Sequence, residues 1–267
     1  MNKNNITRIA FGIVLLSLLF AILVGAGFVS ILKVLFPNFD SIAISLLSMF
    51  VSTLMIALPV IVYLRINGLS IRRRLRINRI SKNTLFSIII ISGGFIIIID
   101  ELDRIVYALF GSPDFLSELV EQLKITSVLN GVLIILTTII VAPLVEEMLF
   151  RGFLQKVLEE SWEDITKAIL VTSLFFALVH LNPYWIVQIY LLGMLLGYLS
   201  WRTKSIIPGI ILHGLNNGFA VALNNAEDVF NRYYNWHNHV NPIWVIFAII
   251  IIFLGFKTLN KDLENQS

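Results

Sequence analysis

Six polar side chains lie in otherwise apolar segments of this sequence, and their types suit hydrolysis. They are Glu146, Glu147, Arg151, His180, His213 and Asn217. An ionisable residue inside a membrane-spanning helix costs about 2.5–3.5 kcal/mol, so each is a functional candidate. A carboxylate and two imidazoles can activate water, either with Glu146 as general base or through a metal held by Glu146, His180 and His213. Asn217 can donate to a developing oxyanion, and the set therefore suits peptide-bond hydrolysis in the membrane.

Helical spacing assigns faces to these side chains. Glu147 and Arg151 are four residues apart, so we expect them to form an ion pair along one helix face. Glu146 is rotated by about 100° from Glu147 and is free to face something else. His213 and Asn217 share one face by the same four-residue spacing, and we expect Pro208 to bend their helix and open space beside it.

The depth of Glu146 and His180 in the membrane depends on where the intervening helices end. Residues 152–160 remain amphipathic, so we expect the helix that carries Glu146 to continue to about Glu160 and to turn through residues 161–164. Glu146 then lies about 16 residues before the turn and His180 about 17 after it. At 1.5 Å per residue, both lie about 25 Å from the turn and can meet.

The composition indicates an integral membrane protein. Of 267 residues, 57% are hydrophobic and 14% are charged, and the mean hydropathy is +0.86. The absence of cysteine excludes disulfides, thiolate zinc sites, iron–sulfur clusters and a cysteine nucleophile. The net charge of +3 is small and its basic residues lie between apolar runs, so we expect no nucleic acid partner.

Apolar runs predict an all-α, polytopic membrane helix bundle with about eight transmembrane helices. The predicted spans are residues 9–32, 42–64, 84–108, 128–150, 166–182, 185–201, 205–223 and 243–257. The first run exceeds the length of a signal-peptide core, so an uncleaved helix is the favoured interpretation. No repeat or linker divides the chain, which predicts a single integral membrane domain over residues 1–267.

The basic residues predict the orientation of the bundle. With the N-terminus in the cytoplasm, sixteen of the twenty lysines and arginines fall in cytoplasmic segments, so we expect both termini to be cytoplasmic. The basic run from Arg72 to Lys82 is expected to contact anionic lipid headgroups; a specific partner is the alternative.

Three ordered motifs resemble those of a known family. The strings Glu146-Glu147-x-x-x-Arg151, Phe176-x-x-x-His180 and His213-x-x-x-Asn217 are similar to the motifs of the CPBP intramembrane proteases, also called Abi. That family includes type II CAAX prenyl endopeptidases and bacterial bacteriocin-processing and self-immunity proteins. The resemblance covers about residues 130–223, which would form the catalytic core.

The resemblance implies a role for each matched residue. Glu146 and His180 would activate the attacking water, His213 and Asn217 would bind the oxyanion, and Glu147 and Arg151 would hold the geometry. Members are described both as metalloproteases and as metal-independent glutamate proteases, so the cofactor is either a divalent metal such as zinc or none.

The implied activity is an intramembrane endopeptidase acting on a hydrophobic peptide or membrane protein. The alternatives are a non-catalytic bacteriocin self-immunity or scaffold protein, and, less favoured for lack of a repeat, a transporter. Abundant Asn, Ile and Lys favour a bacterial origin, so we expect a multi-pass protein of the bacterial cytoplasmic membrane, surrounded by lipids.

Other polar residues have ordinary interpretations. His237 and His239 have metal-like spacing but fall in an outer loop, where solvated histidines are expected. Asp100 and Arg104 can pair at the outer end of the third span, where a helix end with snorkelling side chains is expected.

Overall fold

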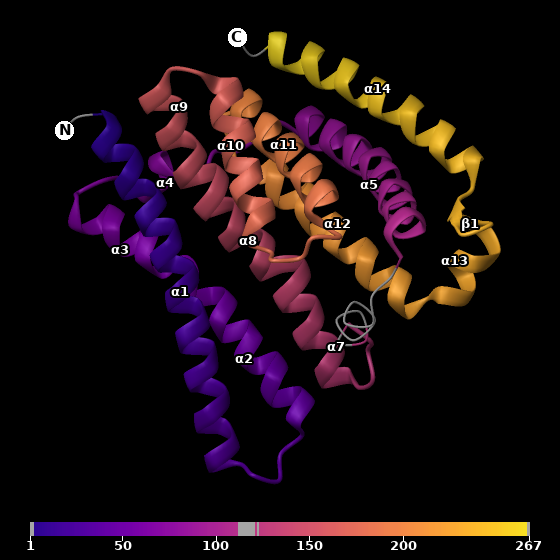
Figure 1. Ribbon diagram of the computed structural model, residues 1–267. Helices are drawn as coiled ribbons and strands as arrows, with labels where there is room; N and C mark the ends of the chain where they lie inside the picture. The colour runs from indigo at the N-terminus through magenta and orange to yellow at the C-terminus, as the bar shows by residue number, and fades with distance from the viewer. Residues whose placement is uncertain (1–2, 112–120, 122, 266–267) are drawn as a thin grey trace.

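A computed structural model describes residues 3–111, 121 and 123–265, and this part of the chain is almost entirely helical (Figure 1). The helices outside the segment 128–162 are α1 (Lys3–Leu35), α2 (Ser41–Met55), α3 (Leu58–Ile66), α4 (Ile71–Arg74), α5 (Lys82–Phe110), α10 (Ile165–Leu178), α11 (Ile186–Thr203), α12 (Ile207–Asn225), α13 (Glu227–Tyr233) and α14 (Pro242–Glu264). Two short antiparallel strands, β1 (Asn235–Trp236) and β2 (His239–Val240), interrupt the helical pattern. The all-α prediction is otherwise confirmed.

The helix from Val128 to Trp162 is continuous and is called the central helix below. It consists of α7 (Val128–Ile134), η1 (Ile135–Val141), α8 (Ala142–Glu147), η2 (Met148–Gln155) and α9 (Lys156–Trp162), of which η1 and η2 are π-helical. It ends at Glu163 in a left-handed conformation, and the Asp164 side chain caps α10 by accepting from the Lys167 N–H. The predicted continuation past Phe150 and the predicted turn are thus confirmed.

Within the part of the chain that the structure describes, five helical segments are long and apolar enough to cross a membrane, judged by length and composition. They are Asn5–Leu35, Ser41–Ile66, Lys82–Phe110, Val128–Trp162 and Pro242–Glu264. The chain is therefore a polytopic helical membrane protein. The three remaining predicted spans form α10, α11 and α12; α10 is a shorter apolar helix.

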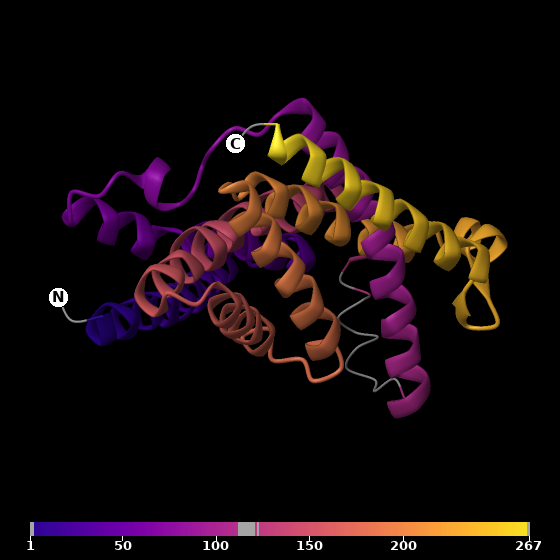
Figure 2. The same cartoon turned by 90° about the horizontal axis from the view of Figure 1, so that it is seen from above.

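The helices pack on both sides of the central helix, which runs through the middle of Figure 1. On one side α1 packs against η2 and α9, and α2 against α7 and η1. On the other side α10, α11 and α12 contact the central helix, and α5 covers α12. Helix α14 lies along α5, as Figure 2 shows from above.

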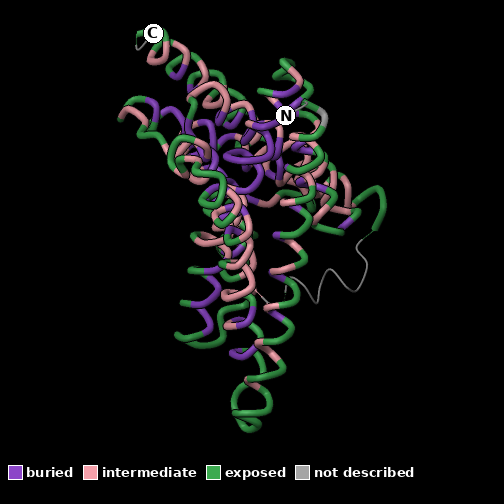
Figure 3. The backbone as a smooth tube through the Cα atoms, turned by 90° about the vertical axis from the view of Figure 1, so that its left-hand side faces the viewer, coloured by how far each residue is buried: buried purple, intermediate pink, exposed green. Residues whose placement is uncertain are grey.

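Buried residues gather in the interior of the half of the bundle that holds the two termini, as Figure 3 shows. Arg151, Phe150 and Phe176 are the largest fully buried side chains among the described residues. Large apolar side chains of α1 and α14, such as Leu23 and Phe253, are exposed instead. Exposed apolar helix faces are expected where lipid replaces water as the surrounding solvent.

The two ends of the bundle gather the segments that the charge pattern assigns to opposite sides of the membrane. At one end Lys3 pairs with Glu163, and the Ser81 hydroxyl donates to Asp262 at 2.6 Å. At the other end the Trp185 indole donates to the Tyr107 hydroxyl at 2.7 Å. The alternation of eight helices across a membrane stays a prediction.

The prediction that Pro208 bends its helix is wrong. Pro208 lies in the first turn of α12, which begins at Ile207. At that position the missing N–H of proline costs no helical hydrogen bond and its fixed φ favours helix initiation. Pro208 therefore starts the helix that carries His213 and Asn217.

Candidate active site

Glu147 and Arg151 form a fully buried ion pair in the core of the bundle. Arg151 Nη1 donates to Glu147 Oε1 at 2.8 Å, and both side chains are 0% exposed. Arg151 Nη2 donates to the Gly193 carbonyl at 3.3 Å, and the guanidinium lies 4.2 Å from the centre of the Phe176 ring. The predicted i,i+4 pair is confirmed, and it ties the central helix to α10 and α11.

His213 on α12 faces both carboxylates of the central helix. Its Nδ1 lies 3.2 Å from Glu147 Oε1, and its Nε2 lies 3.8 Å from Glu146 Oε2. Because an ionised carboxylate can only accept, Nδ1 carries the proton in the contact with Glu147. His213 therefore turns Nε2 toward Glu146, the residue rotated out of the buried pair.

The close approach of α12 to Glu147 depends on Gly209. A Cβ atom at this position would lie 2.6 Å from Glu147 Oε2 and 3.2 Å from its Cδ. Real Cβ atoms do not approach oxygen so closely, so the carboxylate or the helix would have to move. Gly209 thus permits the contact between His213 and Glu147.

His180 lies just beyond the end of α10, where the helix opens into a turn. Its Nδ1 lies 2.6 Å from the Phe176 carbonyl, which can only accept, so we assign the proton to Nδ1 and leave Nε2 as an acceptor. The centre of the Phe176 ring lies 4.8 Å from that of His180 and 5.8 Å from that of His213. Phe176 therefore contacts both imidazoles and packs them in place.

Asn217 binds a backbone carbonyl of the π-helical segment η1 that has no hydrogen-bond partner within the helix. The Ala142 N–H donates to the Thr137 carbonyl, five residues earlier, as in a π-helix. In the same pattern, the Thr138 carbonyl would accept from the N–H of Pro143. Proline has no N–H, which leaves the Thr138 carbonyl without a helical partner. Asn217 Nδ2 donates to that carbonyl at 2.8 Å and joins α12 to η1.

Four of the six predicted residues line one cavity of about 580 Å³. They are Glu146, His180, His213 and Asn217, which come from the central helix, the end of α10, and α12. Glu147 and Arg151 lie behind this surface and support it through His213 and Phe176. The structure therefore brings all six into one site, in two groups.

Comparison with known proteins gives a family for this region. Residues 128–219 match the family model described as type II CAAX prenyl endopeptidase Rce1-like. This segment is an Rce1-like domain. The resemblance to the CPBP, or Abi, family is thereby confirmed. No curated protein and no solved structure matches the chain.

The Rce1-like domain contains all six predicted residues, but α5 outside it forms part of the cavity wall. Asp100, Asp103 and Tyr107 of α5 line the cavity. Asp100 does pair with Arg104 at 3.0 Å, but its interpretation as a snorkelling side chain at a helix end is wrong, because Asp100 lines the cavity and α5 continues to Phe110. A carboxylate within a long apolar helix indicates a functional residue, and this criterion identified Glu146. The same criterion applies to Asp100.

His239, expected in a solvated outer loop, is 42% exposed but also has a partner in the protein. Its Nδ1 lies 2.8 Å from Glu101 Oε1 on α5, and the Val240 N–H donates to the same carboxylate at 2.7 Å. The β1–β2 hairpin is therefore held against α5, beside the cavity wall rather than inside it.

The site contains donor groups of the kinds that bind a metal ion. Two imidazole nitrogens and a carboxylate are the donor types of catalytic zinc sites, and both Nδ1 atoms already have acceptor partners, as outer-shell contacts require. Within residues 3–111, 121 and 123–265, however, no three His, Cys, Asp or Glu side chains lie close enough together to hold a metal. The donor types fit a zinc site, but their placement does not.

Proposed function

We propose that this protein is an intramembrane endopeptidase that hydrolyses peptide bonds of membrane-associated peptides or proteins. The observation that carries the proposal is the convergence of Glu146, His180, His213 and Asn217 on one cavity of the helix bundle. Membership of residues 128–219 in a family of prenyl endopeptidases supports the same reaction class. Taken alone, the three sequence motifs are also consistent with unrelated contacts between helices. Side chains from all three motifs line one cavity, which favours a shared function instead.

The proposed reaction starts with a water molecule between Glu146 and His180. The unprotonated Nε2 of His180 accepts one hydrogen bond from the water, and the Glu146 carboxylate removes the other proton. The water oxygen then attacks the carbon of the scissile carbonyl. Glu146 passes its proton to the leaving amine nitrogen, so one peptide and one water give a carboxylic acid and an amine.

Two further side chains would stabilise the negative charge on the substrate oxygen. An amide nitrogen has two hydrogens, so the bond from Asn217 to Thr138 leaves a second donor for the oxyanion. An imidazolium at His213 would donate Nδ1–H to Glu147 and Nε2–H to the oxyanion. Glu147 and Arg151 would hold His213 and Phe176 without contacting the substrate.

The proposal includes the setting of the site. Eight spans with both termini cytoplasmic, in a bacterial cytoplasmic membrane, place the two ends of the bundle on opposite membrane faces and the cavity between them. The expected substrate is hydrophobic, because it must reach a cavity whose remaining wall includes apolar residues such as Ile99, Leu192 and Phe219.

The family resemblance also implies a divalent metal such as zinc as the source of the activated water, but within the described residues the placement of the donor side chains does not fit one. The steps above use only side chains of the chain. Treatment with a chelator, followed by addition of zinc, distinguishes the two: loss and recovery of cleavage would require the metal.

The test of the proposed function uses purified protein in liposomes with a library of hydrophobic peptides, and mass spectrometry of the products. Glu146→Gln and His180→Ala should each lower the cleavage rate about 100-fold or more, because general acid–base catalysis contributes at least that much. The matched controls are Glu163→Gln and His237→Ala, whose side chains are exposed and outside the cavity.

Wild-type rates in the Glu146→Gln and His180→Ala proteins would contradict the proposal. If the wild-type protein cleaves no peptide but these variants lose the capture of a protein partner, the non-catalytic self-immunity or scaffold function is favoured instead.

A further inference from the structure

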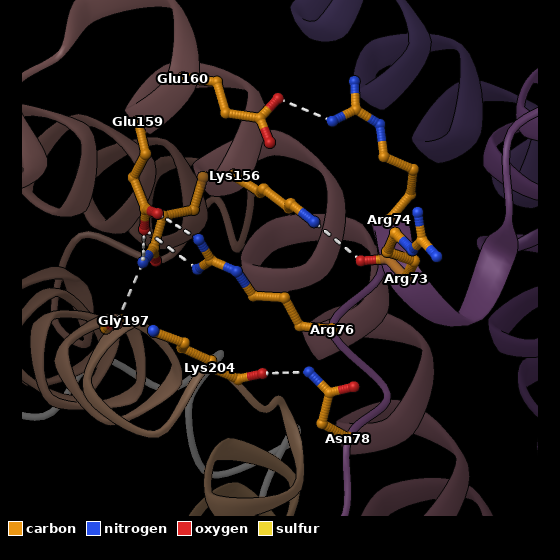
Figure 4. Close-up of polar contacts among 10 residues, drawn as sticks. Arg73, Arg74, Arg76, Asn78, Lys156, Glu159, Glu160, Gly197 and Lys204 are labelled. Atoms are coloured by element: carbon orange, nitrogen blue, oxygen red, sulfur yellow. Dashed lines mark hydrogen bonds and ion pairs between the residues drawn. The ribbon is translucent and has the colours of Figure 1, made fainter. Parts of the chain in front are cut away.

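Residues 70–81 form a basic segment, called the strap below. The strap contacts other parts of the same chain at one end of the bundle. Figure 4 shows its polar contacts with the central helix and with the loop before α12. Arg74 Nη1 lies 2.7 Å from Glu160 Oε2, and Lys156 Nζ donates to the Arg73 carbonyl at 2.7 Å. Arg72, Arg73 and Arg79 remain exposed, so their contact with anionic headgroups stays a prediction.

The side chain of Arg76 binds the central helix through a buried carboxylate. Both terminal nitrogens of Arg76 donate to the two oxygens of Glu159, with Nη1 at 3.1 Å from Oε1. The Arg76 side chain is 12% exposed and that of Glu159 is 9% exposed. A two-point contact between planar groups fixes orientation as well as distance, which a surface ion pair does not do.

Glu159 belongs to a row of polar residues that leads along the central helix to the active site. Glu147, Arg151, Gln155 and Glu159 follow at four-residue intervals. Gln155 Nε2 donates to Glu159 Oε1 at 2.8 Å and to the Gly197 carbonyl at 3.0 Å, just as Arg151 bonds to Glu147 and to Gly193. This row of side chains binds the central helix to α11 and extends from the active site to Arg76.

The backbone of the strap binds the start of α12. Arg76 has a φ of 53°, in the left-handed region, and its carbonyl accepts from the Ile206 N–H at 3.1 Å. The Ser205 hydroxyl donates to the Asn78 carbonyl at 2.6 Å and accepts from the Ile207 N–H at 3.2 Å. These bonds fix the first turn of α12, six residues before His213.

We propose that Arg76 is a positioning residue, whose side chain holds the helix of Glu146 and Glu147 while its backbone holds the helix of His213. This inference rests on the proposed function for its catalytic consequence. The contacts at risk are those of His213 Nδ1 with Glu147 at 3.2 Å and of His213 Nε2 with Glu146 at 3.8 Å. A shift of α12 relative to the central helix changes both distances together.

The kinetic test compares Arg76→Met, Arg76→Lys and Glu159→Gln with the wild-type protein on the library peptide that it cleaves fastest. Arg76→Met should lower kcat about 10-fold to 100-fold with little change in KM, and should shift the pH profile of kcat, because the surroundings of His213 change. Arg76→Lys should restore part of kcat, because it keeps one charged donor to Glu159. The double variant Arg76→Met/Glu159→Gln should be no worse than the poorer of its two single variants.

The matched control is Arg74→Met, which removes a more exposed pair with the same helix and should leave kcat and the pH profile unchanged. A wild-type kcat and pH profile in Arg76→Met would overturn the inference. Loss of cleavage in Glu146→Gln together with unchanged kcat in Arg76→Met would overturn only the positioning role and leave the proposed function intact.

A second measurement does not depend on activity or on the folding of one variant. The chain has no cysteine, so spin labels can be attached at Leu144→Cys and Leu215→Cys, exposed residues of the two helices. The label-to-label distance distribution should shift or broaden with Arg76→Met or Glu159→Gln, but not with Arg74→Met. Identical distributions in all of these proteins would overturn the inference, whatever the protein cleaves.

Discussion

At the scale of single residues, the site depends on one arginine that meets three different partners. Arg151 donates to a carboxylate and to a backbone carbonyl, and its planar face packs on Phe176. Only a flat guanidinium with several donors can meet all three demands at once. Phe176 in turn contacts both imidazoles, so Arg151 influences His180 and His213 without touching either proposed reacting atom.

We predict that Arg151→Met lowers the free energy of unfolding by about 3–5 kcal/mol, because it leaves Glu147 buried without a cation. Arg151→Lys should also be destabilising, by a smaller amount, since an ammonium cannot reach the carboxylate, the carbonyl and the ring together. Thermal unfolding in detergent, followed by fluorescence, measures both effects. Arg79→Lys, at an exposed arginine, is the control, and equal Tm values for Arg151→Lys and the wild-type protein would contradict the prediction.

At the scale of elements, departures from regular α-helix build the site. The π-helical segment η1 and Pro143 leave the Thr138 carbonyl open for Asn217, and a second π-helical segment, η2, carries Arg151. The start of α12 lies directly on Glu147 because Gly209 has no side chain. The relative placement of two helices thus rests on a glycine, a proline and an amide.

We predict that Gly209→Ala lowers both stability and cleavage, because the added methyl group meets Glu147 Oε2 at 2.6 Å. The expected loss is about 1–3 kcal/mol, as for other overpacked core positions. Gly218→Ala on the same helix is the matched control for stability, since its Cβ would meet Ile139 Cδ1 at an ordinary 3.6 Å. Equal stability of the two variants in thermal unfolding would show that α12 can move away from Glu147 at no cost.

At the scale of the whole molecule, two sets of polar contacts lie at opposite ends of an apolar bundle. The strap, the turn at residues 163–164 and the last turn of α14 share one end, whereas the β1–β2 hairpin and the start of α11 lie at the other. This separation is what a multi-pass protein requires, because hydrated loops cannot enter the hydrocarbon layer. It supports the proposal that α10, α11 and α12 also cross the membrane.

We predict the sidedness of four loops, which single cysteines in this cysteine-free chain can report. A membrane-impermeant maleimide should label Asn38→Cys and Asn238→Cys in intact cells, but Arg79→Cys and Lys204→Cys only after permeabilisation. All four positions are exposed, so lack of labelling reports sidedness rather than burial. Labelling of Lys204→Cys in intact cells would contradict the eight-span arrangement.

The sequence by itself determined the membrane class, the helices and the six candidate residues. Apolar runs and charge placement report directly on transfer into lipid, and i,i+4 spacing reports directly on a helix face, so the Glu147–Arg151 pair followed from local geometry. The turn at residues 161–164 followed from local signals as well. The expected bend at Pro208 failed because proline has one effect inside a helix and another at its first turn.

Only the tertiary structure decided which residues meet across helices. The contacts of His213 with Glu147, of Asn217 with Thr138, and of Arg76 with Glu159 join positions 66, 79 and 83 residues apart, and no local pattern encodes such distances. The structure also places Asp100, which was expected at a helix end, in a cavity wall beside Asp103. The spacing of residues along the sequence determines which face of a helix is polar. The packing of the helices, which depends here on glycines and on carbonyls without a helical partner, determines which other polar face that face contacts.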